Sequence, residues 1–238
     1  MTEHLEETQA PEEEAQYWTK LGKEYEAAFG DDACLRQAVE QFLEPLPLDS
    51  QILEFGSGTG RPIAELVSDS GRHIHGIDIA PGMAEISRKQ VPQGIFEVID
   101  MLKFDPKIKY DGIIASLSIF ELSRDEVSEM VGKWFQWLKP DGLLLIVTFA
   151  AEDCSKQVKS DTYDADGHCA QNVKWTFMGT IKLITLFTRL GWERLLKDAG
   201  LQIIHASNDL FIPAAEGCDP EPRHYIQAKK LRNPSTSE

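Results

Sequence analysis

A glycine-rich loop is the segment of this sequence with the clearest chemical potential. Residues 54–60 read Glu-Phe-Gly-Ser-Gly-Thr-Gly, directly after a short apolar run and directly before Arg61-Pro62. Glycines at alternate positions let the backbone turn sharply and let a ligand approach main-chain N–H groups without interference from a Cβ atom. Open parallel sheets bind ligands at the carboxyl ends of their strands. The loop therefore predicts a nucleotide-type cofactor site.

Two acids follow at the ends of the next two apolar runs. Asp78 comes 18 residues after Gly60, where a carboxylate can accept hydrogen bonds from both ribose hydroxyls of an adenosine group. Asp100 precedes Met101, and an acid beside an apolar side chain suits an adenine ring. Either acid alone could simply cap or solvate a loop. Together with Glu54, these acids at successive strand ends indicate an adenosine-binding crevice.

The elements that must position these residues alternate between short apolar runs and helical segments, a pattern typical of a parallel sheet with crossover helices. We expect strands at 51–55, 73–78, 95–99, 111–116 and 143–148, and helices at 62–68, 82–90 and 124–138. A helix at 191–199 and strands at 201–207 and 224–228 follow, the last two strands forming an antiparallel pair. The predicted fold class is a three-layer α/β/α, Rossmann-like domain over residues 15–230, with a mostly parallel seven-stranded sheet and an antiparallel last strand.

Four segments lie outside this alternation. Residues 1–14 contain six acids and no Lys or Arg, which predicts an acidic disordered tail. Residues 15–47 have helical spacing and predict an N-terminal lid of two helices, with Asp31 or Asp32 capping the second. Residues 150–190 predict a cap insert over the substrate, made of a polar loop and an apolar helix at 177–190, and residues 231–238 predict a C-terminal tail.

Composition excludes several classes of partner. The 238 residues include 24 Lys and Arg against 39 Asp and Glu, a net charge of −15, which disfavours nucleic acid and anionic membrane surfaces. The longest apolar run, 143–151, is shorter than the roughly 18 residues that span a bilayer. The N-terminus does not resemble a signal peptide, so we expect a cytoplasmic protein. With no basic groove and a cap that can enclose a pocket, we expect a small molecule as its partner. The four cysteines are far apart and predict free thiols and no metal site. The oligomeric state stays open.

The glycine spacing distinguishes between cofactors. The pattern Glu-x-Gly-x-Gly-x-Gly, followed by Asp78 and Asp100, resembles the class I S-adenosylmethionine-dependent methyltransferases. The resemblance extends from about residue 51 to 148, through 110–114 as the fourth strand and 137–143 before the fifth, where Asp141 replaces the first glycine of the family's usual LKPGG. A dinucleotide fingerprint has its last glycine one residue later, where Arg61 stands here. A nicotinamide-dependent reductase is therefore the less favoured enzymatic alternative.

The resemblance implies S-adenosyl-L-methionine as cofactor and methyl transfer to an O, N or S atom of a small-molecule metabolite. It implies that the methionine part of the cofactor contacts Gly56, Ser57, Gly58 and Gly60, with Glu54 steadying that loop or the ammonium group. It further implies that the ribose contacts Asp78 beside Ile79 and Met83, that the adenine contacts Asp100 and Met101, and that Ser116 contacts the cofactor through its backbone. Tyr17, with Trp18 and Tyr25, resembles the aromatic lid of small-molecule members, and an aromatic face suits a sulfonium.

A general base matters when the acceptor must lose a proton, and two residues are candidates. His168 lies in the predicted cap, and histidine commonly exchanges protons near neutral pH, although a His in a polar loop is more often solvated. Glu121 lies just beyond the fourth strand and could equally complement a helix N-terminus. A non-enzymatic alternative is a partner or activator protein that binds the cofactor without methylating, with the acidic tail as a docking arm.

Overall fold

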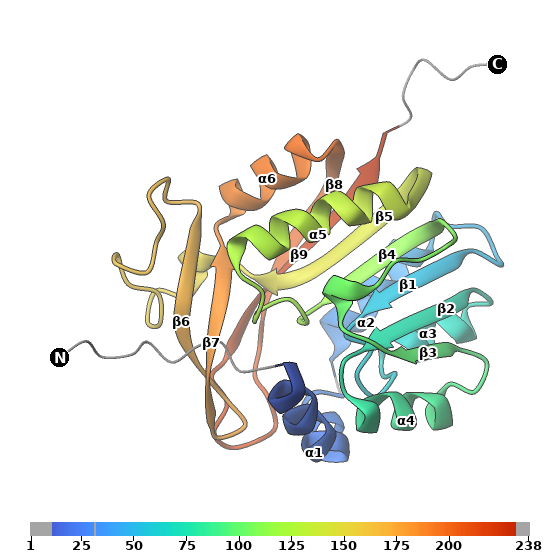
Figure 1. Ribbon diagram of the computed structural model, residues 1–238, viewed down its shortest axis with the longest axis horizontal. Helices are drawn as coiled ribbons and strands as arrows, with labels where there is room; N and C mark the ends of the chain where they lie inside the picture. The colour runs from blue at the N-terminus through green and yellow to red at the C-terminus, as the bar shows by residue number, and fades with distance from the viewer. Residues whose placement is uncertain (1–10, 31, 232–238) are drawn as a thin grey trace.

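The computed structural model describes residues 11–30 and 32–231 and contains a seven-stranded sheet with the order β3-β2-β1-β4-β5-β9-β8 (Figure 1). Its strands are β1 (Gln51–Phe55), β2 (His73–Asp78), β3 (Ile95–Val98), β4 (Tyr110–Ser116), β5 (Leu138–Phe149), β8 (Leu201–Phe211) and β9 (Glu221–Lys230). Strands β1 to β5 pair in parallel, and β9 pairs antiparallel with both β5 and β8. The predicted fold class is confirmed.

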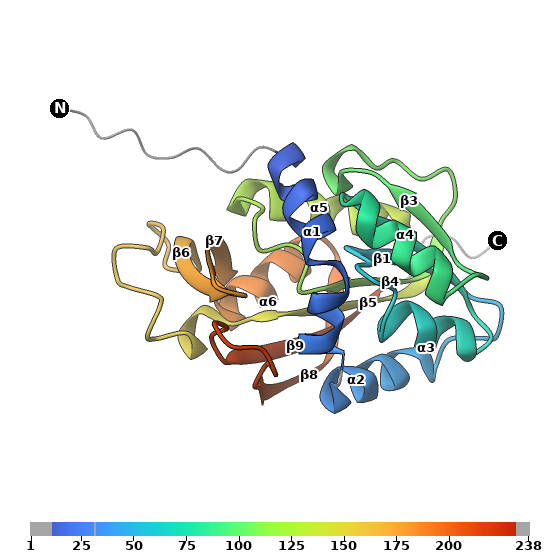
Figure 2. The same cartoon turned by 90° about the horizontal axis from the view of Figure 1, so that it is seen from below.

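Helices cover both faces of the sheet: α2 and α3 lie on one side, and α5 and α6 on the other (Figure 2). Their bounds are α2 (Ala33–Leu43), α3 (Ile63–Asp69), α4 (Pro81–Gln90), α5 (Arg124–Trp137) and α6 (Arg189–Asp198), with short 3-10 turns η1 (Met101–Lys103) and η2 (Ala151–Asp153). Each face has its own apolar core, built around Trp134 on the α5 side and Phe42 on the α2 side. In the part of the chain described, no helix is long and apolar enough to span a membrane.

Local caps explain where two of these helices begin. The Asp32 carboxylate accepts a hydrogen bond from the Leu35 amide at 2.9 Å and caps α2, as the sequence predicts. Ser123 and Glu126 form a reciprocal capping box at the start of α5, which satisfies backbone N–H groups that lack helical partners. These caps fix the first residues of α2 and α5.

The cap insert differs from the prediction, because the helix expected at 177–190 is wrong. The segment is instead an antiparallel hairpin of β6 (Cys169–Phe177) and β7 (Thr180–Phe187). Burial alternates along β7: Ile181 and Leu183 are exposed, whereas Lys182 and Ile184 are buried. This period of two is the mark of a strand. Met178 and Gly179 form the connecting turn, both with positive φ, as tight hairpins require.

The N-terminal segment also differs from the prediction, since residues 11–14 belong to α1 (Pro11–Phe29) rather than to a tail. Glu12, Glu13 and Glu14 lie in its first turn, where acids complement the helix dipole. Helix α1 has a kink at Gly22 and lies between the β6–β7 hairpin and α4 in both views (Figures 1 and 2). The remaining residues of the two predicted tails, 1–10 and 232–238, lie outside the described residues.

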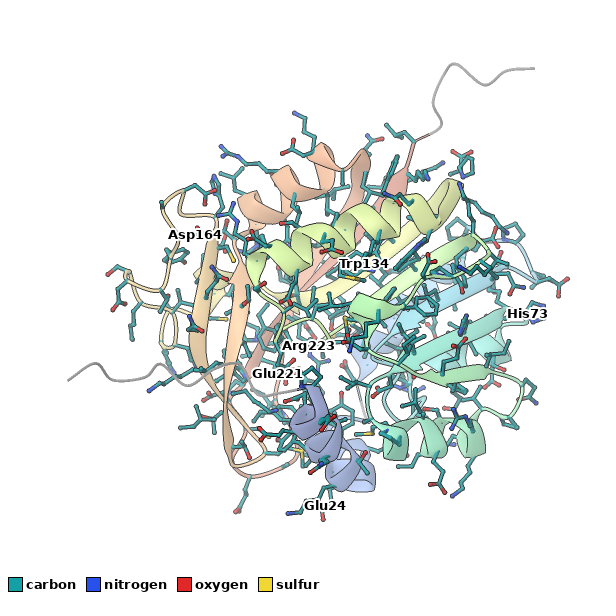
Figure 3. The ribbon with its side chains drawn as sticks, viewed as in Figure 1. Glu24, His73, Trp134, Asp164, Glu221 and Arg223 are labelled. Atoms are coloured by element: carbon teal, nitrogen blue, oxygen red, sulfur yellow. The ribbon has the colours of Figure 1, made fainter. Side chains whose placement is uncertain are left out.

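A buried cluster of charges ties α2 to the sheet. Arg223 on β9 is 1% exposed and forms ion pairs with Asp32 and Glu221, both buried. Figure 3 shows Glu221 and Arg223 beside each other. Because an unpaired buried charge is costly, each member requires the others.

Replacing Arg223 with methionine should destabilise the fold strongly. The substitution leaves the carboxylates of Asp32 and Glu221 buried without their cation, and we expect the free energy of unfolding to fall by about 3–5 kcal/mol. Denaturant unfolding measures this value. Lys107→Met, which removes a cation of an exposed pair with Asp105, is the control and should leave stability essentially unchanged. Equal stability of the two variants would contradict the role assigned to Arg223.

Candidate active site

A cavity of about 280 Å³ lies at the carboxyl ends of β1, β2 and β4 and beneath α1. Nine of the residues predicted for the site line it: Gly56, Gly58, Asp78, Ile79, Met83, Asp100, Met101, Ser116 and Glu121. They come from five separate segments of the chain. The structure therefore brings together most of the positions that the sequence motif contains.

The glycine loop is held in shape by its own backbone. The amides of Gly56 and Ser57 both donate to the carbonyl of Ile77, at 2.9 and 3.0 Å. Gly56 has φ +67°, and a Cβ atom there would lie 2.4 Å from the Cβ of Ser118. Gly58 has φ +52°, and a Cβ atom there would meet no atom within 4 Å. Gly56 is thus required for close packing, whereas Gly58 leaves open space where the loop borders the cavity.

Asp78 connects this loop to the end of β2. Its Oδ2 accepts from the Gly58 amide and its Oδ1 from the Ala80 amide, both at 2.8 Å. Burial raises the pKa of Asp78, while the two amide hydrogen bonds act in the opposite direction. Each carboxylate oxygen has a second lone pair. Asp78 can therefore brace the loop and still accept hydroxyl groups from a ligand.

Three of the predicted site residues, Glu54, Ser57 and Gly60, line neither cavity. They belong to the glycine loop and contribute to its packing. Glu54 is 3% exposed, and burial together with the charge of Asp78 raises its pKa well above the ordinary value. Gly60 packs against Ser87 of α4, with 3.3 Å between its ideal Cβ position and the Ser87 Cα atom. The Glu54 Oε2 and the hydroxyls of Ser57 and Ser118 are buried and have no hydrogen-bond partner among the described residues. Of these three residues only Ser118 lines the larger cavity, and an unsatisfied hydroxyl in a cavity wall fits a polar ligand.

The third strand end presents Asp100 and Met101. Asp100 caps η1 by accepting from the Leu102 amide at 2.9 Å, and its second oxygen lies 3.3 Å from the Lys103 ammonium. With Ile99 and Leu102, Met101 forms an apolar wall on this side of the cavity. The combination of an acceptor and apolar atoms can hold a flat base with an exocyclic amine.

A second, smaller cavity of about 40 Å³ adjoins the first, and four residues line both: Trp18, Tyr25, Leu117 and Glu121. Its other walls come from the tip of the hairpin and from β5 and β9, with Phe149, Trp175 and Phe177 among them. Lys182 and Glu221 also face this space. The two cavities therefore share part of their walls; one is bordered by the glycine loop, and the other is lined mainly by aromatic side chains.

Glu121 stands at the junction of the two cavities. Burial raises its pKa to about 7, the charge of Glu14 adds to this effect, and Lys182 opposes it. Ser123 caps α5, so Glu121 precedes the helix and is not its cap. A carboxyl group that changes charge near neutral pH can exchange a proton with an acceptor.

Two predicted site residues lie away from both cavities. His168 is at the base of the hairpin, where its Nε2 contacts the Arg194 guanidinium. Tyr17 points to the hairpin: its hydroxyl donates to the Phe177 carbonyl at 3.4 Å, and the Lys182 ammonium lies 3.9 Å from the centre of its ring. The neighbouring Trp18 and Tyr25 line the cavities instead.

Sequence reasoning missed several lining residues, among them Glu14, Ser118 and Lys182. Ser118 could have been found, since it follows the predicted fourth strand within two residues. Glu14 and Lys182 could not, because they are 168 residues apart and their ion pair, at 2.7 Å, exists only in the folded chain.

A family model described as a methyltransferase domain matches residues 27–206. The chain belongs to the class I S-adenosylmethionine-dependent methyltransferase family. It is 31% identical over 150 residues to phosphoethanolamine N-methyltransferase of Plasmodium falciparum, and this match covers 59% of this chain and 56% of that protein. It is 32% identical over 124 residues to aklanonic acid methyltransferase of a Streptomyces species, covering 48% and 53%. The matches span about half the length of these curated relatives.

Solved structures show the same fold. One is the 1,6-didemethyltoxoflavin-N1-methyltransferase of Burkholderia thailandensis with 1,6-didemethyltoxoflavin and S-adenosylhomocysteine bound, at a TM-score of 0.65 and 17% identity, with 98% of this chain and 94% of that chain covered. Another is an N-methyltransferase of Bradyrhizobium japonicum in complex with S-adenosylhomocysteine, at a TM-score of 0.63, 13% identity and coverage of 93% and 99%. At these identities the likeness concerns the fold.

Replacing Gly58 with alanine should weaken S-adenosylhomocysteine binding at least about tenfold in calorimetry, because the new methyl group enters the open space beside the loop. A side chain at positive φ also costs about 1–2 kcal/mol of stability. Gly167→Ala is the matched control, since Gly167 has φ +70° and equally open surroundings but lies in the loop before β6. It should lose similar stability and keep its affinity. Wild-type affinity in Gly58→Ala would remove this loop from the cofactor site.

Proposed function

We propose that this protein transfers a methyl group from S-adenosylmethionine to a small-molecule acceptor that reaches the cofactor through the aromatic cavity. The observation that carries the proposal is the convergence of Gly58, Asp78 and Asp100 on one cavity. Membership of the methyltransferase family favours this cofactor over a nicotinamide dinucleotide. The names of two relatives, which act on phosphoethanolamine and aklanonic acid, support a metabolite as acceptor.

The residues present fit S-adenosylmethionine, which when bound supplies a methyl group on a sulfonium. In our proposal the backbone of Gly56 and Gly58 contacts the methionine part, Asp78 accepts the ribose hydroxyls, and Asp100 accepts the adenine amine. Further contacts come from Ile79, Met83, Met101 and Ser116, which line the same cavity. Four predicted site residues do not line this cavity. In our proposal Glu54, Ser57 and Gly60 shape the glycine loop, and Tyr17 holds α1 against the hairpin.

The chain's main contribution to the reaction is alignment and exclusion of water. In-line displacement at a methyl carbon gains most from holding the two reacting atoms in the correct geometry. Trp18 and Tyr25 of α1 and Phe177 of the hairpin pack together, with ring centres 5.4 Å apart for Trp18 and Phe177. This aromatic roof covers the junction of the cavities and limits the access of water to it.

Glu121 and His168 are the two candidates for the general base that takes a proton from the methyl acceptor. The position of Glu121 in both cavities favours it, whereas His168 lies beside Arg194 at the base of the hairpin. Glu121 is therefore our proposed base.

The direct test is turnover. Purified protein is incubated with S-adenosylmethionine and a panel of acceptors, and S-adenosylhomocysteine is measured by mass spectrometry. Acceptor-dependent product supports the proposal. Tight cofactor binding without product from any acceptor would favour the partner or activator alternative, and binding of NAD(P)H instead would favour a reductase. We further expect the protein in the cytoplasm, which fractionation of cells would test.

Replacing Asp78 with alanine should weaken S-adenosylhomocysteine binding at least about tenfold, because the ribose loses a charged acceptor and the Gly58 amide loses its partner. Calorimetry measures the change. Asp111→Ala is the control. The Asp111 carboxylate also accepts a backbone hydrogen bond, from the Gln51 amide at 2.8 Å, but it lies at the amino ends of β1 and β4, away from the cavity. Its affinity should stay within about twofold of wild type. Equal losses in both variants would show a general effect of folding.

A further inference from the structure

The smaller cavity has walls of an unusual composition. Seven of its twelve lining residues are aromatic, and three of the others are charged. The aromatic rings come from α1, β5, β6 and the loop after β4, so they surround the space from several sides. Aromatic faces attract cations through their quadrupole, an effect that grows when water is excluded.

The charges around this space have an excess of carboxylates. The Lys182 ammonium is held by both oxygens of Glu14, at 2.7 and 2.8 Å. Arg223 is held by Glu221 and Asp32. Both cations are therefore already paired with carboxylates of this chain, and their charges are not available to attract an anionic ligand.

Glu121 is the charged group that remains. Among the described residues no Lys, Arg or His lies within 4 Å of its carboxylate. It lines both cavities, at the point where an acceptor atom would meet the cofactor site. An ammonium ligand at this point would supply the missing partner, whereas a carboxylate or phosphate would be repelled.

The size of the cavity limits what can enter. A cavity needs at least about 10–15 Å³ to hold one water molecule, so about 40 Å³ accommodates a group of a few heavy atoms. A whole metabolite does not fit, but an ammonium with short alkyl substituents does. The rest of the acceptor must extend along the larger cavity or past the lid.

We infer that the acceptor is an amine, bound through its nitrogen between Glu121 and the aromatic walls and methylated on that nitrogen. This inference rests on the proposed methyl transfer and specifies its acceptor class. The Glu121 carboxylate takes one proton from the ammonium, which frees the nitrogen lone pair. The nitrogen–carbon bond then forms as the carbon–sulfur bond breaks, and the electron pair of that bond stays on sulfur. The nitrogen ends as a methylated ammonium, and the proton on Glu121 passes to solvent.

The test uses three probes of similar shape: propylamine, 1-propanol and propionate. Each is titrated into the full chain, with and without saturating S-adenosylhomocysteine, and binding is followed by calorimetry and by tryptophan fluorescence, to which Trp18 and Trp175 in the cavity wall contribute. We expect propylamine to bind at least about tenfold more tightly than 1-propanol, and propionate to bind most weakly. No binding of propylamine, or equal binding of the three probes, overturns the inference.

Glu121→Gln tests the carboxylate with little change in shape. Propylamine affinity should fall at least about tenfold, and the affinity for S-adenosylhomocysteine should change less than about twofold. The matched control is Glu129→Gln, which removes the same charge from an exposed position of α5 that pairs with Lys133. It should leave both affinities unchanged. Equal propylamine binding by Glu121→Gln and the control overturns the assignment of Glu121.

The pH dependence separates a direct role of Glu121 from a structural one. The groups around Glu121 are Glu14 and Tyr17 of α1, Glu126 of α5, Lys182 of β7 and Glu221 of β9. Burial raises the pKa of Glu121 to about 7 and that of Glu221 to about 8, and propylamine stays protonated. Between pH 6 and pH 7 Glu221 stays mostly protonated, so the affinity for propylamine should rise about fivefold through the ionisation of Glu121. In Glu121→Gln the affinity should stay flat. A similar rise in both proteins contradicts the inference.

Trp18→Leu provides a second variant that keeps an apolar surface. Loss of the aromatic face should weaken propylamine several-fold more than 1-propanol, and an equal effect on both probes counts against the inference. Failure of the proposed function and failure of the inferred acceptor class give different results. If S-adenosylhomocysteine does not bind, the proposed function fails, even if propylamine is the preferred probe. With S-adenosylhomocysteine bound and no amine preference, the function stands and the acceptor class falls.

Discussion

The hydrogen bonds to the Asp78 carboxylate are the interaction on which the rest of the site depends. By accepting from the Gly58 and Ala80 amides, this carboxylate joins the loop after β1 to the loop after β2 across the edge of the sheet. The glycine loop can adopt its positive-φ turns because Gly56 and Gly58 have no side chain. Buried polar atoms of Glu54 and Ser57 in this loop have no hydrogen-bond partner among the described residues, and neither has the hydroxyl of Ser118, which lines the cavity. A buried carboxylate is costly, and a ligand with hydroxyl groups would lower that cost.

The roof over this site is assembled from distant parts of the chain. Helix α1 contributes Trp18 and Tyr25, and the hairpin contributes Phe177 and Lys182. The Lys182–Glu14 pair is a buried bridge between the two, in which both carboxylate oxygens of Glu14 accept from the Lys182 ammonium. Helix α1 contacts α4 on both sides of its Gly22 kink: Thr19 accepts a hydrogen bond from the Gly82 amide, and Glu26 accepts one from the Gln90 side chain. The roof therefore combines apolar contacts with one specific charge pair.

The sequence predicted the sheet and the larger cavity well because these depend on local patterns. Each strand is a short apolar run, and a parallel sheet brings the ends of such runs to one edge. Asp78 and Asp100 could thus be placed from their positions alone. The helix predicted at 177–190 was wrong because the strand alternation of the hairpin begins within an apolar stretch that also fits a helix. Lys182, a buried cation in the middle of β7, was the residue that concealed the strand pattern.

The sequence by itself determined the fold class, the glycine loop and the acids at the strand ends, since each is a property of neighbouring residues. Only the tertiary structure decided which groups meet at the acceptor side. Glu121 gains its raised pKa from burial and from Glu14, more than a hundred residues earlier. Tyr17 and His168 lie outside the cavities because α1 and the hairpin turn those side chains to other partners. Burial and charge environment depend on packing between distant segments, and neither is encoded in the local spacing of residues.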